Sequence, residues 1–217
     1  MHTQFKNVLV LSPHTDDAEL GAGGFIHRLI QSGANVIYAA FSTAEESLQE
    51  GLPKDTLTTE VKAATQRLGI KSENLILFNY RVRQLNYHRQ EILEDLIQLR
   101  KKCEYDLVLL PSQNDIHQDH QTIASEGLRA FKKTTILGYE LVWNNLSFNT
   151  TSFVVLHQED IDKKVAALSC YKSQGFRDYM SKDFIFSLAR TRGVQIGTSY
   201  AEAFEVVRFV MEHDKDL

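Results

Sequence analysis

The sequence is poor in the residues that mark several large classes of protein. It has two cysteines, Cys103 and Cys170, far apart along the chain, so we expect reduced, buried thiols and no disulfide framework. It has three prolines among 217 residues, and no Pro-, Gly- or Ser-rich stretch that would read as a linker. We therefore expect a single domain over residues 1–217.

Two further absences limit the partners of the chain. No apolar run reaches the length of a membrane span, and the start MHTQFKNVLVLSP lacks the long apolar stretch of a secretory signal. Lysine and arginine number 24 against 28 acidic residues, a formal net charge of −4, so no basic surplus exists to neutralise phosphates. We expect a cytoplasmic protein without membrane insertion or nucleic-acid binding. The sequence leaves open whether it is a homo-oligomer.

What is present is an alternation of short apolar runs and amphipathic segments. Runs of the first kind lie at 7–13, 35–42, 74–80, 106–112 and 134–140, and suit strands buried on both faces. Segments with helical spacing lie between them, at 18–33, 56–70 and 89–102, and the first two contain a glycine stop. Strand–helix–strand alternation predicts an open, mostly parallel α/β sheet.

The alternation weakens after residue 141. Residues 143–149 read as a loop that leads into a strand, and helices are expected over 159–172 and 183–193, the second ending at Gly193. Residues 202–211 fit either a closing strand or a short helix.

Two polar clusters follow predicted strands. The first, PHTDD, places His14, Asp16 and Asp17 after strand 7–13. The second, SQNDIHQDHQ, follows strand 106–112 and contains Asp115, His117, Asp119 and His120. Ligands of open α/β sheets bind outside the carboxyl ends of the strands, so the clusters meet if both strands flank the switch point.

Imidazole and carboxylate groups without a thiolate suit zinc or a similar divalent ion. The competing interpretation is that each cluster only caps a helix, with Thr15 or Asp16 as the first cap. Each cluster alone fits capping, but two such clusters after two buried strands favour a functional site. The glycines of AELGAGG do not match G-x-G-x-x-G, and we read them as helix–sheet packing.

The paired motifs resemble those of a known family. PHTDDAELGAGG resembles the PHPDDxExGxGG signature of the LmbE-like (PIG-L) zinc-dependent N-deacetylases, and NDIHQDHQTI resembles their HPDH signature. The resemblance implies a Rossmann-like three-layer α/β/α fold. It also implies a metal-dependent amide hydrolase that removes acetyl from an N-acetylated sugar or conjugate of the N-acetylglucosamine type, with metal-bound water attacking the acetamide carbonyl.

The family's roles transfer to matching positions. The resemblance assigns one zinc ion per chain, although other divalent ions fit, to His14, Asp17 and His120. It makes Asp16 the general base. His117 would be the general acid or the cation that stabilises the oxyanion, and Asp119 would hydrogen-bond His117 and fix its tautomer and charge.

The chain departs from the family in places. Thr15 and Gln118 stand where the family usually has proline, and the arginine that many members carry just before Glu60 is missing. Substrate-binding candidates in its place are Arg83 and Arg89 of NYRVRQLNYHRQ, together with Trp143 of WNNLSFN as a sugar face. The competing interpretations are that the arginines belong to a solvated segment and that Trp143 is an ordinary packed side chain.

A second function is compatible with the same residues. A metal-dependent phosphoesterase would need extra carboxylates that bridge two ions, and Asp115 and Asp119 are available for that task. A non-catalytic binding module would have lost a ligand or the base, and none is lost.

Overall fold

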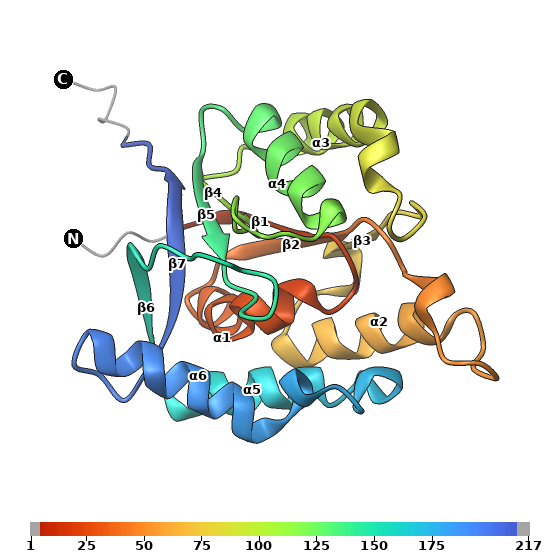
Figure 1. The fold of residues 1–217 in the computed structure, drawn as a ribbon. Coiled ribbons are helices and arrows are strands. Elements are labelled where there is room, and N and C mark those ends of the chain that lie inside the picture. The colour runs from red at the N-terminus through yellow and green to blue at the C-terminus, as the bar shows by residue number, and fades with distance from the viewer. Residues whose placement is uncertain (1–4, 212–217) are drawn as a thin grey trace.

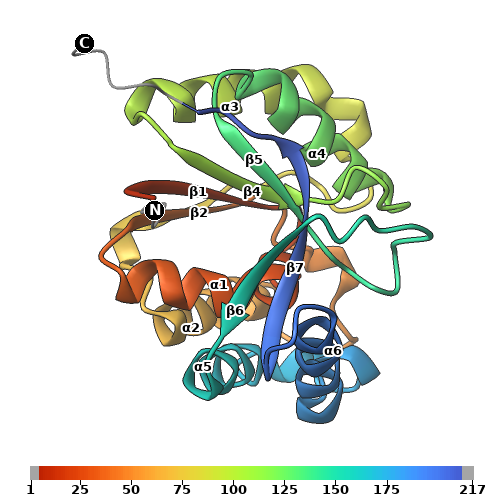
Figure 2. The same cartoon turned by 90° about the vertical axis from the view of Figure 1, so that its left-hand side faces the viewer.

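The computed structural model describes residues 5–211 and has one seven-stranded sheet between two layers of helices (Figures 1 and 2). The strands are β1 (Asn7–Ser12), β2 (Asn35–Ala40), β3 (Leu75–Leu77), β4 (Leu107–Pro111), β5 (Thr135–Tyr139), β6 (Ser152–Leu156) and β7 (Tyr200–Arg208). Their order is β3-β2-β1-β4-β5-β7-β6. The first five are parallel, and β7 and β6 close one edge in antiparallel pairing. This confirms the Rossmann-like, mostly parallel sheet.

The helices divide between the two faces of the sheet. They are α1 (Asp17–Gln31), α2 (Thr56–Leu68), α3 (Arg89–Lys102), α4 (Gln118–Ala130), α5 (Gln158–Leu168) and α6 (Lys182–Gln195). Short 3-10 turns are η1 (Glu45–Ser47), η2 (Ser72–Asn74), η3 (Leu85–His88), η4 (Lys172–Gln174) and η5 (Asp178–Met180). Helices α3 and α4 cover one face, and α1, α2, α5 and α6 lie on the other (Figure 1).

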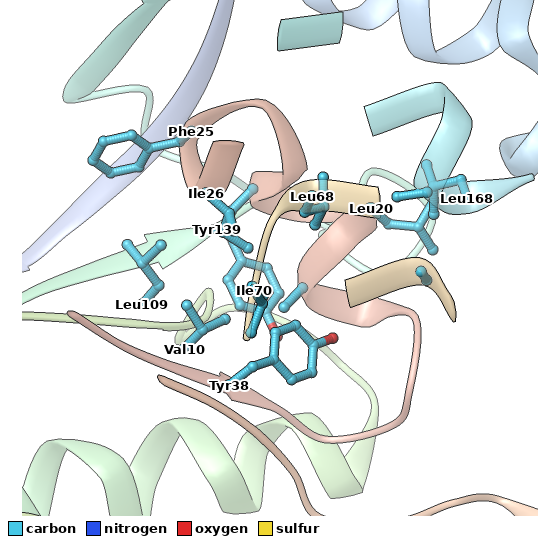
Figure 3. Packing of buried hydrophobic residues seen from close by; sticks show 14 of the residues in the cluster. Val10, Leu20, Phe25, Ile26, Tyr38, Leu68, Ile70, Leu109, Tyr139 and Leu168 are labelled. Atoms are coloured by element: carbon cyan, nitrogen blue, oxygen red, sulfur yellow. The ribbon is translucent and has the colours of Figure 1, made fainter. Parts of the chain in front are cut away.

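The continuous apolar runs supply a core on each side of the sheet. In β1, Val8 and Val10 pack with the α1 side, whereas Leu9 and Leu11 pack with the α3 and α4 side, and all four are fully buried. Figure 3 shows Val10 in the first of these clusters. Alternation of side chains along a strand thus explains why β1 lacks a polar face.

Glycines at two positions permit close packing. A Cβ on Gly21 of α1 would lie 2.3 Å from the ring of Tyr139 in β5, which confirms packing as the role of this glycine. Gly193 was expected to end a helix, and this is wrong, because α6 continues to Gln195. A Cβ on Gly193 would lie 2.7 Å from the backbone nitrogen of Tyr200, so close approach to β7 requires the glycine.

Other local predictions were corrected in detail. Of the two alternatives for residues 202–211 the strand is correct, since β7 covers Tyr200–Arg208, whereas α5 ends at Leu168, four residues before its predicted end. Cys103 and Cys170 are free but only partly buried. No helix within residues 5–211 has both the length and the apolar character that a membrane crossing demands.

The strand order fixes where a site can form. Strand β1 pairs with β2 on one side and with β4 on the other, so the order of the parallel strands reverses between β1 and β4. The segments that follow these two strands contain the two polar clusters. The condition under which the two clusters meet is therefore fulfilled.

Candidate metal centre and active site

The segment after β1 is held in a tight turn by its own side chains. The hydroxyl of Ser12 donates to the carbonyl of His14 (2.5 Å) and accepts from the N–H of Ala18 (3.1 Å). The carboxylate of Asp17 accepts from the N–H of His14 (2.8 Å). Asp16 takes the N-cap position of α1 but makes no capping hydrogen bond, so helix capping does not account for its carboxylate.

The segment after β4 is organised around Asp115. This carboxylate accepts from the N–H of His117 (2.8 Å) and lies 2.7 Å from Nδ1 of His120. His117 caps α4, because its Nδ1 accepts from the N–H of Asp119 (3.1 Å). The capping interpretation is therefore correct for His117 alone. His120 follows in the first turn of α4 and is 2% exposed, so its ring points inward.

Three donor atoms from the two segments converge. His14 Nδ1 lies 3.0 Å from Asp17 Oδ2, His120 Nε2 lies 3.2 Å from the same oxygen, and the two nitrogens are 3.3 Å apart. Ligands of a tetrahedral zinc ion, bound at about 2.0–2.2 Å, are separated by roughly 3.3 Å. The donor set and its spacing therefore fit zinc, and the three residues line a cleft.

His117 offers a second, looser set. One nitrogen each from His14, His117 and His120 lie within 4.8 Å of one another. The Asp17 oxygen is closer to both other donors than that limit. His14 and His120 are thus common to two candidate donor sets, which differ in whether Asp17 or His117 is the third donor.

A carboxylate stands behind each histidine of the candidate site. Asp119 Oδ2 lies 2.9 Å from Nε2 of His14, and Asp115 holds His120 through the far ring nitrogen. Such carboxylates orient metal-binding histidines and increase their basicity. Asp119 does hydrogen-bond His117, as predicted, but through its backbone N–H (3.1 Å), whereas its carboxylate faces His14. The N–H groups of Arg83 (2.6 Å) and Leu85 (3.2 Å) hold that carboxylate on the side of His14.

The charges of the candidate ligands are coupled. Burial opposes a charge on His14, but Asp17 and Asp119 outweigh it and raise its pKa to about 9. Burial is likewise outweighed at His120, where Asp17 and Asp115 raise the pKa to about 10. Burial favours a neutral Asp17, but the two histidines overcome it and hold the pKa of this carboxyl well below its usual range. Two positively charged imidazoles thus lie beside one anionic oxygen of Asp17. A divalent ion bound between the three groups can supply that positive charge in place of the two protons.

Asp16 and His117 have pKa values shifted in opposite directions. Burial first, then repulsion from Asp17, raises the pKa of Asp16 to about 6. Burial first, then the neighbouring His120 and His14, lowers the pKa of His117 to about 4. The cationic His117 expected from the sequence is therefore disfavoured. A neutral His117 whose Nδ1 accepts a hydrogen bond carries its proton on Nε2.

These groups open onto a cleft of about 310 Å³. Arg83 and Trp143 line this cleft, as predicted for substrate-binding residues. One face of Trp143 is stacked on Tyr179, with ring centroids 3.8 Å apart. Arg89 does not reach the cleft lining, because its guanidinium binds the buried carboxylate of Glu126 (2.6 Å).

Sequence reasoning missed three groups at this site. Arg177 and Tyr179 line the cleft from the segment after η4. Asp115 proved to hold two histidine groups and is not spare. Arg177 lies three residues after the stretch YKSQ (171–174), and no pattern in the sequence marked it as part of the cleft.

An α/β sheet with a His–Asp–His donor set at its switch point defines a class of proteins suited to metal-assisted hydrolysis. Within that class, the chain belongs to the GlcNAc-PI de-N-acetylase (PIG-L) family, whose family model matches residues 9–131. This confirms the resemblance of the two motifs. A curated relative is the diacetylchitobiose deacetylase of Thermococcus kodakarensis, 23% identical over 235 residues, covering 96% of this chain and 85% of that protein.

Solved structures share the fold. The N,N'-diacetylchitobiose deacetylase of Pyrococcus horikoshii has a TM-score of 0.77 and 24% identity, covering 93% of this chain and 83% of its own. The 4-carboxy-2-hydroxymuconate hydratase of Pseudomonas putida also has a TM-score of 0.77, with 19% identity, covering 96% of this chain and 99% of its own. Since this fold also supports a hydratase, the function has to be argued from the site.

Proposed function

We propose that this protein is a zinc-dependent hydrolase that removes the acetyl group from an N-acetylated amino sugar or its conjugate. One observation carries the proposal: His14 Nδ1, Asp17 Oδ2 and His120 Nε2 lie 3.0–3.3 Å apart beside a cleft that also exposes Asp16 and His117. Family membership and the diacetylchitobiose deacetylases among its relatives support an N-acetyl sugar as the substrate class.

The proposed reaction needs a base and a proton donor for nitrogen. Zinc, when bound, supplies Lewis-acid polarisation of the water and the acetamide carbonyl. Asp16 takes a proton from the attacking water, whose oxygen forms a bond to the carbonyl carbon. The C–N bond then breaks, Asp16 returns the proton to the leaving nitrogen, and acetate and a free amine result. A carboxyl with a pKa of about 6 is suited to both transfers near neutral pH.

His117 takes the part of a neutral donor in this proposal. Its Nδ1 is engaged by the N–H of Asp119, so Nε2–H is the group left for substrate. Directed at the oxygen that gains charge during attack, it would stabilise the transition state as an oxyanion-hole donor does. This replaces the imidazolium expected from the sequence, which the lowered pKa opposes.

A two-metal phosphoesterase is less well supported. It requires carboxylates free to bridge a second ion. Asp115 and Asp119 each bind a histidine and backbone N–H groups, so both are engaged. We therefore favour one ion per chain.

The test is a substrate screen with zinc-loaded protein. The panel contains N-acetylglucosamine, its methyl glycoside, its 1-phosphate and N,N'-diacetylchitobiose, with release of free amine and acetate measured in parallel. We expect equal amounts of both products, loss of activity after chelation and its return with added zinc. Hydrolysis of bis-p-nitrophenyl phosphate without amine release from any N-acetyl sugar would contradict the proposal.

A further inference from the structure

Two arginines line the cleft without a carboxylate of the described residues in ion-pair distance. Among residues 5–211, Arg83 and Arg177 line the cleft and form no ion pair, Arg83 donating to the hydroxyl of Ser47 (3.1 Å) and Arg177 to the side chain of Gln174 (2.8 Å). Several other arginines are paired with carboxylates: Arg28, Arg81, Arg89, Arg129 and Arg192. Arg100, Arg190 and Arg208 donate to backbone carbonyls and lie outside the cleft lining, so Arg83 and Arg177 are distinguished by their position in the cleft.

A chain of hydrogen bonds fixes the position of Arg177. The carboxylate of Glu60 in α2 accepts from the N–H (2.9 Å) and the hydroxyl (2.6 Å) of Ser173. The amide of Gln174 donates to that hydroxyl (3.2 Å), and its oxygen accepts from Nε of Arg177. Glu60, Ser173 and Gln174 are buried. Arg177 is therefore held through Nε, and its guanidinium lies against the ring of Tyr179, 5.7 Å from the centroid, at the cleft lining.

The backbone conformation at Arg83 places this residue at the cleft. Its N–H is bound by the carboxylate of Asp119, and its φ of 65° lies in the left-handed region, so this position of the loop is fixed by the site itself. Two residues earlier, Arg81 is bound by Glu46 (3.0 Å) and does not line the cleft. Glu46, in η1 beside the Ser47 that Arg83 contacts, thus already binds Arg81, and no carboxylate of the described residues forms an ion pair with Arg83.

The charge balance of the cleft indicates what it binds. Asp17 is committed to the candidate metal site, and Asp16, which interacts electrostatically with Arg177, is the other carboxylate of the lining. Two guanidinium groups therefore face one carboxylate that the candidate metal site does not use, and neutral donors such as Ser47 and Asn144 are present for sugar hydroxyls. A substrate that fills the cleft removes water from both guanidinium groups, which is costly unless the substrate supplies opposite charge. The chain as a whole has a net charge of −4, so this local positive charge runs against the average of the molecule.

We propose that the physiological substrate is an N-acetyl amino sugar that carries an anionic group, a carboxylate or a phosphate, bound by Arg177 with Arg83 as a second positive charge. This inference rests on the proposed deacetylase function and names its substrate class. Guanidinium groups bind both anions through paired N–H donors, so the shared chemistry is a planar or tetrahedral oxyanion.

The experiment compares matched substrates. The methyl glycoside of N-acetylglucosamine is the neutral probe, and the 1-phosphate and the carboxymethyl glycoside are the two anionic probes. We expect wild-type kcat/KM to be about 10- to 100-fold higher for at least one anionic probe, through KM, as expected for a charged hydrogen-bonded contact. The two anionic probes distinguish a phosphate from a carboxylate.

Variants then assign the preference. Arg177→Gln should reduce kcat/KM for the anionic probe at least ~10-fold more than for the neutral one, and Arg83→Gln should act in the same direction more weakly. Lys172→Gln and Arg81→Gln, exposed cations outside the cleft lining, are the matched controls and should keep the wild-type preference. Equilibrium binding of glucosamine 1-phosphate and glucosamine to the same proteins gives a readout independent of turnover.

The outcomes separate this inference from the proposed function. Equal kcat/KM for neutral and anionic probes in the wild type would overturn the anionic substrate. An equal loss for both probes in Arg177→Gln would overturn the proposed role of Arg177 in binding the anionic group. Arg177 would then act through Asp16 or through the structure of its loop. Absence of amine release from every probe would count against the deacetylase function. Equilibrium binding of glucosamine 1-phosphate would then test anion binding by Arg177 and Arg83 separately from catalysis.

Discussion

At the scale of the residue, adjacent aspartates differ because of where α1 begins. Asp17 is the first residue of the helix, and its carboxylate accepts from the His14 N–H and lies beside two imidazole nitrogens. Asp16 stands one position earlier, makes no capping bond and has a pKa raised by burial and by Asp17. One side chain is therefore suited to hold a cation and the other to move a proton.

Substitution of Asp16 tests this division. Asp16→Asn should lower kcat by about 10²- to 10⁴-fold, the usual contribution of a general acid–base, because the amide cannot take a proton from water. Zinc content, measured by plasma emission on purified protein, should stay at the wild-type level. Asp178→Asn, at an exposed carboxylate in η5, is the control and should keep wild-type kcat. Loss of zinc in Asp16→Asn would instead identify Asp16 as a ligand.

At the scale of the element, a buried carboxyl joins the start of α1 to the rest of the fold. Glu19 is fully buried and accepts from the hydroxyls of Tyr38 in β2 and Tyr171 (2.8 Å). Both hydroxyls also lie within hydrogen-bonding distance of the Thr15 carbonyl, at 3.0 and 2.5 Å. Strand β2 and the end of the α5 segment therefore hold the turn that presents His14 and Asp16.

The free-energy cost of burying Glu19 should depend on pH. Burial outweighs its hydrogen bonds and raises its pKa from the usual 4.5 to about 8. The folded state thus binds this proton more tightly than the unfolded chain, and wild-type stability falls as pH rises from 4.5 towards 8. In zinc-free protein, the free energy of unfolding of Glu19→Gln minus that of wild type should increase with pH, by at most about 1.4 kcal/mol per unit.

Urea unfolding of zinc-free protein at pH 5, 6.5 and 8 measures this difference. Glu94→Gln, at an exposed glutamate of α3, is the control and should show no such trend. A difference between Glu19→Gln and wild type that is constant over the same range would show that Glu19 keeps an ordinary pKa in the folded chain.

At the scale of the whole molecule, the site exists only because β1 and β4 are neighbours. His14 and His120 are 106 positions apart, and the sheet brings their nitrogens to 3.3 Å. Their carboxylate partners, Asp119 and Asp115, both come from the β4 side. Unfolding of either half therefore separates the donor atoms, and zinc binding should be coupled to the stability of the whole fold.

Zinc binding should release protons. Because the pKa values of His14 and His120 are raised to about 9 and about 10, both rings are protonated at pH 7 in the zinc-free chain and must lose a proton to bind a cation. We expect release of about two protons per zinc. Affinity should rise with pH from 6 to 8. Titration calorimetry in buffers of different ionisation enthalpy measures the number directly.

The same preparation tests the coupling to folding. With zinc at 100-fold its Kd, the melting temperature should exceed that of the chelated protein by roughly 5–10 °C. Zinc binding without proton release, or without a change in melting temperature, would contradict the assigned ligands.

The sequence by itself determined the elements and most of the chemistry. Strand and helix periods are local properties, so β1, β4, α1 and α3 could be read from runs of apolar residues, and the two polar clusters from their place after strands. The donor types, imidazole and carboxylate, indicated a metal site before any coordinates. Element ends were less secure, because Gly193 serves packing against β7 and not termination.

Only the tertiary structure decided which groups pair. The Asp119 carboxylate belongs to His14 because backbone N–H groups from the loop of Arg83 hold it there, a contact between segments 36 positions apart. Glu126 takes Arg89 away from the cleft, whereas Gln174 leaves Arg177 in it. Such partners lie far apart along the chain, and no local pattern encodes them. The lowered pKa of His117 also depends on the fold, since it follows from burial, from His120 three residues along the chain and from His14 in the segment after β1.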